Sequence, residues 1–116
     1  MTKDFKDITN RIIEFRNMRN WKQFHNTKDM TISLLLEASE LLEHFQWKNE
    51  EEAIEHIRLN KEKISDELAD VLYWVLLIAN DLDVNLNDSL SKKMDKNEAK
   101  YPVEKSKNNH KKYTEL

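Results

Sequence analysis

The stretch from Glu62 to Leu82, EKISDELADVLYWVLLIANDL, decides the fold of this chain. Apolar residues recur in it every three or four positions, as in a helix with one buried face. From Tyr73 to Ile78 the apolar character extends nearly all round the helix, which is more apolar surface than a small monomeric protein should expose. The stretch therefore predicts a long, buried helix and association with a further copy of the chain.

Helical periodicity continues on both sides of this stretch, and the composition agrees with it. The chain has 116 residues, no Gly and one Pro, and 35% of its residues are charged. Such a composition is typical of an all-α protein. We predict a four- to five-helix bundle assembled as an oligomer. The predicted helices cover roughly residues 4–19, 28–45, 50–58, 62–82 and 85–100.

Polar residues at the predicted helix starts suggest how each helix is capped. Thr27 is a candidate N-cap for the helix that follows it, because its hydroxyl can accept a bond from a free backbone N–H. Asn49 and Glu52 form a capping-box pattern. Either Asn85 or Asn87 can cap the last helix.

The C-terminal part of the chain is polar and basic. Tyr101-Pro102 ends the last helix, because a residue before Pro disfavours helical geometry. We expect residues 1–103 to form the domain and residues 104–116 to form a polar, extended tail. Eight lysines lie between Lys92 and Lys112, in a chain of net charge −3. They suit a small polyanion, and a solvated tail explains them equally well.

Missing residue types exclude several classes of function. Without Gly the chain has no phosphate-binding loop and no dinucleotide-binding turn. Without Cys it has no disulfide, thiolate nucleophile or Cys-based zinc site, which agrees with a cytoplasmic protein. Apolar runs fall short of the roughly 18 residues of a membrane span, and no signal peptide is evident. We expect neither a membrane nor a nucleic-acid polymer as partner.

Two of the predicted helices carry apolar stripes in matching register. The two segments superpose at an offset of 30 residues. The stripes comprise Leu34, Ala38, Leu41, Leu42 and Phe45 in one helix, and Ile64, Leu68, Val71, Leu72 and Val75 in the other. We expect these two stripes to pack against each other.

A pair of acids borders each stripe. The pairs are Glu37 with Glu40, and Glu67 with Asp70. The members of each pair lie one helical turn apart, so packing of the two stripes would bring all four carboxylates to one seam. Converging carboxylates repel unless a cation lies between them. Oxygen ligands favour a hard cation, Mg²⁺ or Mn²⁺, whereas ordinary surface acids are the alternative interpretation.

Two competing interpretations of the acids remain. A di-iron centre requires a Glu-x-x-His pattern on two helices. No His in this chain lies three residues after a Glu, which argues against that centre. A non-catalytic helical interaction module, with solvated acids and tryptophans that anchor an interface, is the other alternative.

Three tryptophans are candidates for a binding pocket. Trp74 lies one turn beyond Asp70, and Trp47 lies two turns beyond Glu40, on the side of the acids. Each can either stack on a flat ring in a pocket or fill the core. Helical geometry alone favours the core for Trp21.

The four histidines show no catalytic spacing. His25 lies in a polar loop, where a surface position is the simplest interpretation. His44 lies on the acid side of its helix without an evident partner, and His56 and His110 look exposed.

Taken together, these residues resemble the MazG-like family of all-α nucleoside triphosphate pyrophosphohydrolases, and within it the dCTP pyrophosphatase branch. The matching motifs are Glu-x-x-Glu at 37–40, Glu-x-x-Asp at 67–70, Trp-Lys-Gln-Phe-His at 21–25, Phe-Gln-Trp-Lys at 45–48, and the segments 91–97, 101–102 and 112–116. The resemblance covers the chain from about Phe5 to Leu116.

The resemblance implies hydrolysis of a nucleoside triphosphate, dCTP or a 5-modified dCTP, to the monophosphate and pyrophosphate. A broader or non-canonical triphosphate specificity is the alternative within the same class. The resemblance further implies that the protein removes unwanted nucleotides from the nucleotide pool, and that it forms a homodimer or homotetramer.

The same resemblance assigns site residues. It implies that Glu37, Glu40, Glu67 and Asp70 are the catalytic residues and hold Mg²⁺. It implies a base pocket that uses Trp21, His25, Trp47 and Asn97. Trp74 stands where this branch usually has Tyr, and we include it as a substrate-binding residue. Lys93 can hold the leaving pyrophosphate as a point charge, and Glu37 or Glu40 can act as the general base.

Overall fold

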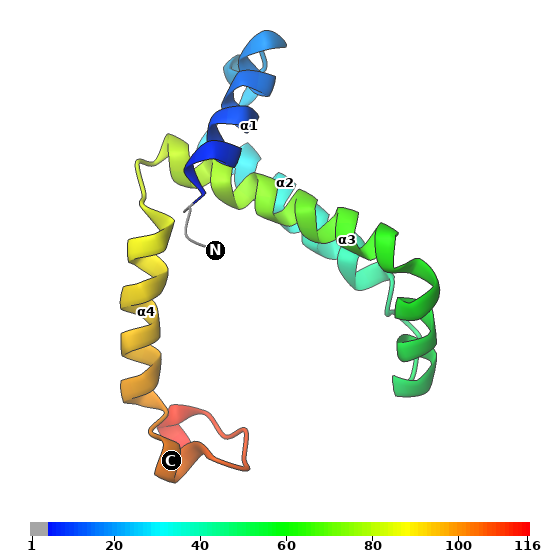
Figure 1. The fold of residues 1–116 in the computed structure, drawn as a ribbon, viewed down its shortest axis with the longest axis vertical. Coiled ribbons are helices and arrows are strands. Elements are labelled where there is room, and N and C mark those ends of the chain that lie inside the picture. Colours follow the sequence, from blue (N-terminus) through cyan, green and yellow to red (C-terminus); the bar gives the residue numbers. More distant parts are fainter. Residues whose placement is uncertain (1–4) are drawn as a thin grey trace. The chain divides into compact units, whose positions relative to one another are not determined.

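The structure, a computed structural model, describes residues 5–116, and its regular elements in that part of the chain are all helices (Figure 1). The elements are α1 (Lys6–Met18), the 3₁₀ turn η1 (Lys22–Phe24), α2 (Thr27–Glu43), α3 (Glu50–Asp81), α4 (Leu86–Lys100), α5 (Val103–Ser106) and the 3₁₀ turn η2 (Tyr113–Glu115). The predicted all-α class is confirmed, whereas oligomeric assembly stays a prediction. Within residues 5–116, no helix combines the length and apolar content that crossing a membrane requires.

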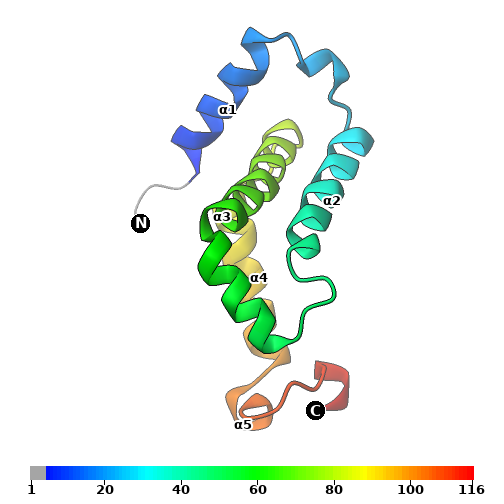
Figure 2. The same cartoon turned by 90° about the vertical axis from the view of Figure 1, so that its right-hand side faces the viewer.

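The chain divides into two compact units, one ending at Asp83 and one spanning Val84–Leu116. The predicted division at residue 103 stays a prediction, as does the start of the first helix at Asp4, which lies outside the described residues. In the first unit α2 and α3 run antiparallel, side by side (Figure 2), and α1 contacts α3. Their buried apolar side chains are Ile12, Met30, Leu76, Leu77 and Ala79.

Asparagine side chains cap α2 and α4. The N-cap of α2 is Asn26, whose side chain accepts a hydrogen bond from the backbone N–H of Asp29 at 2.8 Å. The predicted cap at Thr27 is therefore wrong by one residue, because Asn26 has the extended backbone of an N-cap and Thr27 is already helical. At α4 the cap is Asn85, which accepts from Asp88 at 3.1 Å.

The helix α3 joins two segments that the sequence predicts as separate helices. Its start confirms the predicted capping box, with Asn49 and Glu52 bonded reciprocally at 2.9 and 3.0 Å. At Asn60 the backbone leaves helical geometry, with φ −126° and ψ 26°. The Asn60 side chain donates to the carbonyl of His56 at 3.1 Å, so the helix bends there without ending.

The expected packing of the two apolar stripes is only partly correct. Leu42 is 68% exposed, and Leu68 and Leu72 are exposed as well, whereas the remaining stripe residues of α2 are half-buried. The reason is that the acids lie on the facing sides of α2 and α3, which turns part of each stripe outward. Leu35 and Leu36 add to this exposed apolar face of α2.

The second unit folds its C-terminal residues, contrary to the predicted extended tail. After Pro102 the chain forms α5 and then η2. Tyr113 packs edge-on against Tyr101 at 6.1 Å between ring centroids, and the Lys100 ammonium lies 4.7 Å from the Tyr113 ring. These aromatic and cation–π contacts bring the end of the chain back to the end of α4.

Candidate functional site

The four predicted acids meet between α2 and α3. Ligand oxygens of Glu37, Glu40, Glu67 and Asp70 all lie within 4.8 Å of one another. They converge because the members of each pair are one turn apart on two antiparallel helices in matching register. The convergence expected from the sequence is thus found, and we call these four residues the acid cluster.

Two carboxyl groups of the acid cluster, those of Glu37 and Glu67, have a raised pKa. Burial is the largest cause of the pKa of Glu37 rising to about 7, followed by its proximity to Glu40, Asp70 and Glu67. Burial and the nearby Glu40 and Asp70 carboxylates also raise the pKa of Glu67. Like charges held this close disfavour one another, so Glu37 and Glu67 hold a proton more readily than isolated carboxyl groups do unless a cation compensates the charge.

Two oxygen atoms of the cluster are buried without a hydrogen-bond partner in the described part of the chain. They are Oε2 of Glu37 and Oε2 of Glu67, one from each helix. A buried carboxylate oxygen without a donor is costly. The cluster therefore offers four carboxylates, and two of their oxygens lack a hydrogen-bond donor. Such oxygen ligands are the ones that a hard divalent cation prefers, so the residues fit a metal.

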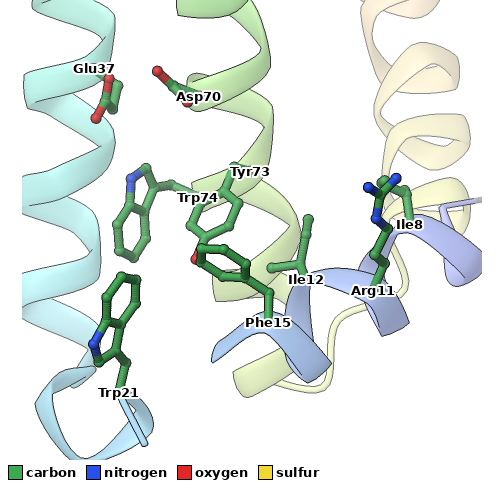
Figure 3. Close-up of a pocket in the computed structure, with 9 residues that line it drawn as sticks. All are labelled: Ile8, Arg11, Ile12, Phe15, Trp21, Glu37, Asp70, Tyr73 and Trp74. Atoms are coloured by element: carbon green, nitrogen blue, oxygen red, sulfur yellow. The ribbon is translucent and has the colours of Figure 1, made fainter. Parts of the chain in front are cut away.

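A pocket of about 480 Å³ adjoins the acid cluster (Figure 3). Its lining residues are Ile8, Arg11, Ile12, Phe15, Trp21, Glu37, Asp70, Tyr73 and Trp74. Glu37 and Asp70 belong to both the cluster and the pocket wall. In Figure 3 these two acids lie at one end, Trp21 lies at the other end, and Trp74 lies between them. The volume suits a small organic ligand, whose charged end would meet the acids.

Aromatic rings in edge-to-face contact build the wall of this pocket. The ring centroid of Phe15 lies 5.6 Å from that of Trp21 and 6.4 Å from that of Tyr73. The ring centroids of Tyr73 and Trp74 are 5.1 Å apart. Such contacts fix the ring orientations. Trp21 thus lies at the pocket wall. The expectation from helical geometry alone, that Trp21 fills the core, is wrong.

Sequence reasoning missed most of the contribution of α1 to this pocket. No role in the site was predicted for Ile8, Arg11, Ile12 and Phe15, which line the pocket from α1. Their spacing of three or four residues was the available signal, because it places all of them on one side of α1. The sequence did not show which helix this side of α1 packs against, and the structure shows that it is α3.

The imidazole of His25 contacts Trp74 of the pocket wall edge to face, with 5.3 Å between the ring centroids. Burial and the neighbouring Arg16 lower its pKa, against a smaller opposing effect of Asp81. The ring is therefore neutral at pH 7. His25 is half-buried, so the simple surface interpretation is wrong.

An ion pair that the sequence did not reveal joins α1 to the end of α3. Arg16 donates to both oxygens of Asp81, at 2.8 and 2.9 Å, and its side chain is 1% exposed. The Arg16 guanidinium holds the pKa of Asp81 below its usual value, against the opposing effect of burial. A charged residue within the apolar pattern of each helix was the only signal of this pair.

Three predicted site residues lie elsewhere. Trp47 lies in the turn between α2 and α3, is 91% exposed and does not line the pocket. Lys93 and Asn97 lie on α4 in the second unit, where the Asn97 side chain contacts the Met94 sulfur. Substrate binding by these three residues stays a prediction.

Two histidines that seemed isolated in the sequence form a pair. Nδ1 of His44, at the end of α2, lies 2.8 Å from Nε2 of His56 on α3. Both rings are half-buried, so the expectation that His56 is exposed is wrong.

Comparison with known proteins agrees with the resemblance seen in the sequence. A model of the MazG-like family matches residues 32–116. The chain is 36% identical over 113 residues to dCTP pyrophosphatase 1 of Mus musculus, and 34% identical to that of Homo sapiens. Each match covers 96% of this chain and 66% of the relative, so the chain spans about two thirds of the length of these relatives.

A solved structure shows the same fold. The crystal structure of a pyrophosphatase from Archaeoglobus fulgidus DSM 4304 superposes with a TM-score of 0.82 and 33% sequence identity. The match covers 88% of this chain and 95% of that one.

Proposed function

The chain belongs to the MazG-like family, and from this premise we propose that it is a nucleoside triphosphate pyrophosphohydrolase. The reaction converts a nucleoside triphosphate to the monophosphate and pyrophosphate. One observation carries the proposal: the acid cluster opens into an aromatic pocket, with Glu37 and Asp70 shared by both. That arrangement suits a ligand with a flat ring at one end and phosphates at the other.

We propose Mg²⁺ as the cofactor, with Mn²⁺ as a substitute. Glu37, Glu40, Glu67 and Asp70 would hold it, which agrees with their clustered oxygens and with the two buried atoms that lack a donor. A bound divalent ion supplies neutralisation of phosphate charge and polarisation of a phosphoryl oxygen.

The residues of the chain then bind and orient the substrate. Trp21 and Trp74 offer ring faces for a nucleobase, and the neutral His25 imidazole packs against Trp74. One carboxylate, Glu37 or Glu40, takes the proton of the attacking water. We propose that Trp47, Lys93 and Asn97 also bind substrate.

We propose dCTP or a 5-modified dCTP as the substrate. The mammalian relatives carry the name dCTP pyrophosphatase 1, and the aromatic pocket agrees with a nucleobase. A broader or non-canonical triphosphate specificity is the alternative, since Trp74 fills a position where that branch usually has Tyr. The cellular role is the removal of unwanted nucleotides in the cytoplasm, without a membrane or nucleic-acid polymer as partner.

Exposed apolar side chains on α2 and α3 support assembly as a homodimer or homotetramer. Leu35, Leu36 and Leu42 on α2 and Leu68 on α3 are all more than half exposed. Apolar surface of this kind is costly in water and marks an interface. Light scattering coupled to gel filtration should give two or four times the chain mass of 14.0 kDa. A species of the single-chain mass would contradict the proposed assembly.

The activity is tested by pyrophosphate release in Mg²⁺ from the common nucleoside triphosphates and 5-methyl-dCTP. We expect release from dCTP or its 5-methyl form, the monophosphate as second product, and no reaction without metal. Glu67→Gln should reduce kcat at least about 100-fold, because it removes one ligand charge while keeping the side-chain shape. Asp66→Asn, an exposed neighbour on the same helix, is the matched control and should react like the wild type.

Absence of release from every nucleotide would overturn the proposal. The non-catalytic interaction module would then be the better account of the helices. Equal activity of Glu67→Gln and wild type would show instead that the acid cluster is not the reaction centre.

A further inference from the structure

At the end of the α2–α3 seam away from the pocket, four basic side chains lie beyond the acid cluster. We call His44, Lys48, His56 and Lys63 the basic end. His44 and His56 are in direct contact, with 2.8 Å between Nδ1 and Nε2. Burial, and then the charges of Lys48, His44 and Lys63, lower the pKa of His56. Lys48 follows His44 by four residues, in the turn after α2, and Lys63 follows His56 by seven residues, about two helical turns, on α3.

The basic end continues the line of the acid cluster on both helices. On α2, His44 follows Glu40 by four residues, and on α3, Lys63 precedes Glu67 by four residues. Four residues are about one helical turn, or about 6 Å along the axis, and such residues share a face. His44 also lies near enough to Glu67 that its charge opposes the raised pKa of that carboxyl, which is caused mainly by burial.

A relay of hydrogen bonds fixes where the protons of the histidine pair lie. The amide nitrogen of Asn60 lies 3.1 Å from the His56 carbonyl and 3.2 Å from Nδ1 of His56, so it donates to both. A neutral His56 that accepts at Nδ1 carries its proton on Nε2 and donates it to Nδ1 of His44. The proton of His44 then lies on Nε2, which can donate to an anion.

The seam therefore has three zones in a fixed order. The aromatic pocket comes first, the acid cluster follows, and the basic end is last, one turn further on. A nucleoside triphosphate has the same order: a flat base, a phosphate next to the sugar, and a terminal pair of phosphates with most of the negative charge. Lysine ammonium groups and an imidazole N–H are common ligands for such phosphates.

We propose that the basic end binds the terminal two phosphates of the substrate and holds them as pyrophosphate after hydrolysis. This inference rests on the proposed function and adds the orientation of the bound substrate. The nucleobase lies at the α1 end of the seam, and the terminal phosphates lie at the basic end. It also places the pyrophosphate site on the first unit, whereas the sequence had offered Lys93 of the second unit for that task.

The test is calorimetric binding of inorganic pyrophosphate to the full chain in the presence of Mg²⁺. Lys63→Gln, Lys48→Gln and His56→Phe should each weaken pyrophosphate binding about tenfold, because each removes a charge or breaks the relay. Binding of the nucleoside monophosphate should stay unchanged in all three. Lys61→Gln is the matched control, since Lys61 is exposed and about 200° round the helix from Lys63.

A structural role of these residues is separated from a binding role by two further measurements. Each variant should keep the helical circular dichroism of the wild type and its Mg²⁺-induced rise in melting temperature. A loss of pyrophosphate affinity on this intact background supports the proposal. A parallel loss of monophosphate affinity would overturn it, because the effect would then not be specific to the terminal phosphates.

Two remaining outcomes separate this inference from the proposed function. If pyrophosphate binds equally to the wild type and to the three variants, or is weakened by Lys93→Gln alone, the basic end is not the site even when the enzyme is active. If no nucleotide is hydrolysed but Lys63→Gln still weakens pyrophosphate binding, the proposed function fails and the site stands.

Discussion

Helix α3 carries acidic side chains that face another helix at two places, and the chain treats them in opposite ways. At Asp81 the partner is supplied from within: Arg16 donates two hydrogen bonds, and the pKa of the carboxyl is lowered. Further back along α3, Glu67 and Asp70 meet two more carboxylates from α2, and the pKa of Glu37 rises to about 7.

The difference shows which of these charges serve the fold. The Arg16–Asp81 pair is complete and joins α1 to the core end of α3. The acid cluster is incomplete, because Oε2 of Glu37 and Oε2 of Glu67 are buried without a donor. A group of four uncompensated carboxylates, beside one carboxylate that is fully paired, agrees with the proposed cation at the second place.

The largest effect is expected from breaking the paired region. Arg16→Met should lower the free energy of unfolding by about 3–5 kcal/mol, because it leaves Asp81 buried without its partner. Urea denaturation measures this change. Combining it with Asp81→Leu should recover most of the loss, since both buried charges are then gone.

An exposed ion pair provides the control for that experiment. Arg58 and Glu55 are also paired, but their side chains are 68% and 55% exposed. Arg58→Met should leave the free energy of unfolding nearly unchanged, because an exposed ion pair is screened by water. Equal losses for Arg16→Met and Arg58→Met would show that burial does not distinguish the two pairs.

Adding the proposed cation should stabilise the region of the acid cluster by a smaller amount. Mg²⁺ at about 100 times its dissociation constant should raise the free energy of unfolding by about 2.7 kcal/mol. Glu67→Gln should lose this response, and Asp66→Asn should keep it. A thermal shift with increasing Mg²⁺ measures both, and an unchanged response in Glu67→Gln would remove the acid cluster as the metal site.

The dependence of stability on pH should have opposite signs in the two regions. Because the pKa of Glu37 is raised from its usual 4.5 to about 7, its protonated form stabilises the metal-free fold, and this stability is lost as pH rises between those values. The lowered pKa of Asp81 acts in the other direction. The stability that ionised Asp81 contributes to the fold is present above the usual pKa of an aspartate, and it is lost as pH falls through the lowered pKa.

Thermal denaturation in EDTA between pH 5 and pH 8 tests the first of these signs. The melting temperature of the wild type should fall with rising pH, and Glu37→Gln should flatten that slope. A wild-type melting temperature that rises across this interval would mean that Glu37 is compensated by the chain itself.

Features that depend on neighbouring residues could be predicted from the sequence. The capping box at Asn49 and the pairing of acids one turn apart follow from helical geometry, and the acid cluster followed from two matching registers. The kink at Asn60 was predicted as a break between two helices, because local pattern cannot tell a bend from an end.

Features that depend on tertiary partners could not be predicted. The Arg16–Asp81 pair joins residues 65 positions apart, and no local signal says that they meet. The His44–His56 pair was missed for the same reason, since it needs the turn after α2 and the bend in α3 together. The outward position of Leu42 could not be read from its stripe, because the acids occupy the facing sides of the helices.

The backbone at Trp47 has a consequence for how this chain can change over generations. Its φ of 67° lies in the left-handed region, which for a bulky side chain costs about 1–2 kcal/mol and for Gly costs almost nothing. A single base change converts the tryptophan codon to a glycine codon, so the cheaper residue is always within mutational reach. Selection for folding alone would accept that change. An indole at this turn, 91% exposed, therefore costs the fold free energy that a glycine would not.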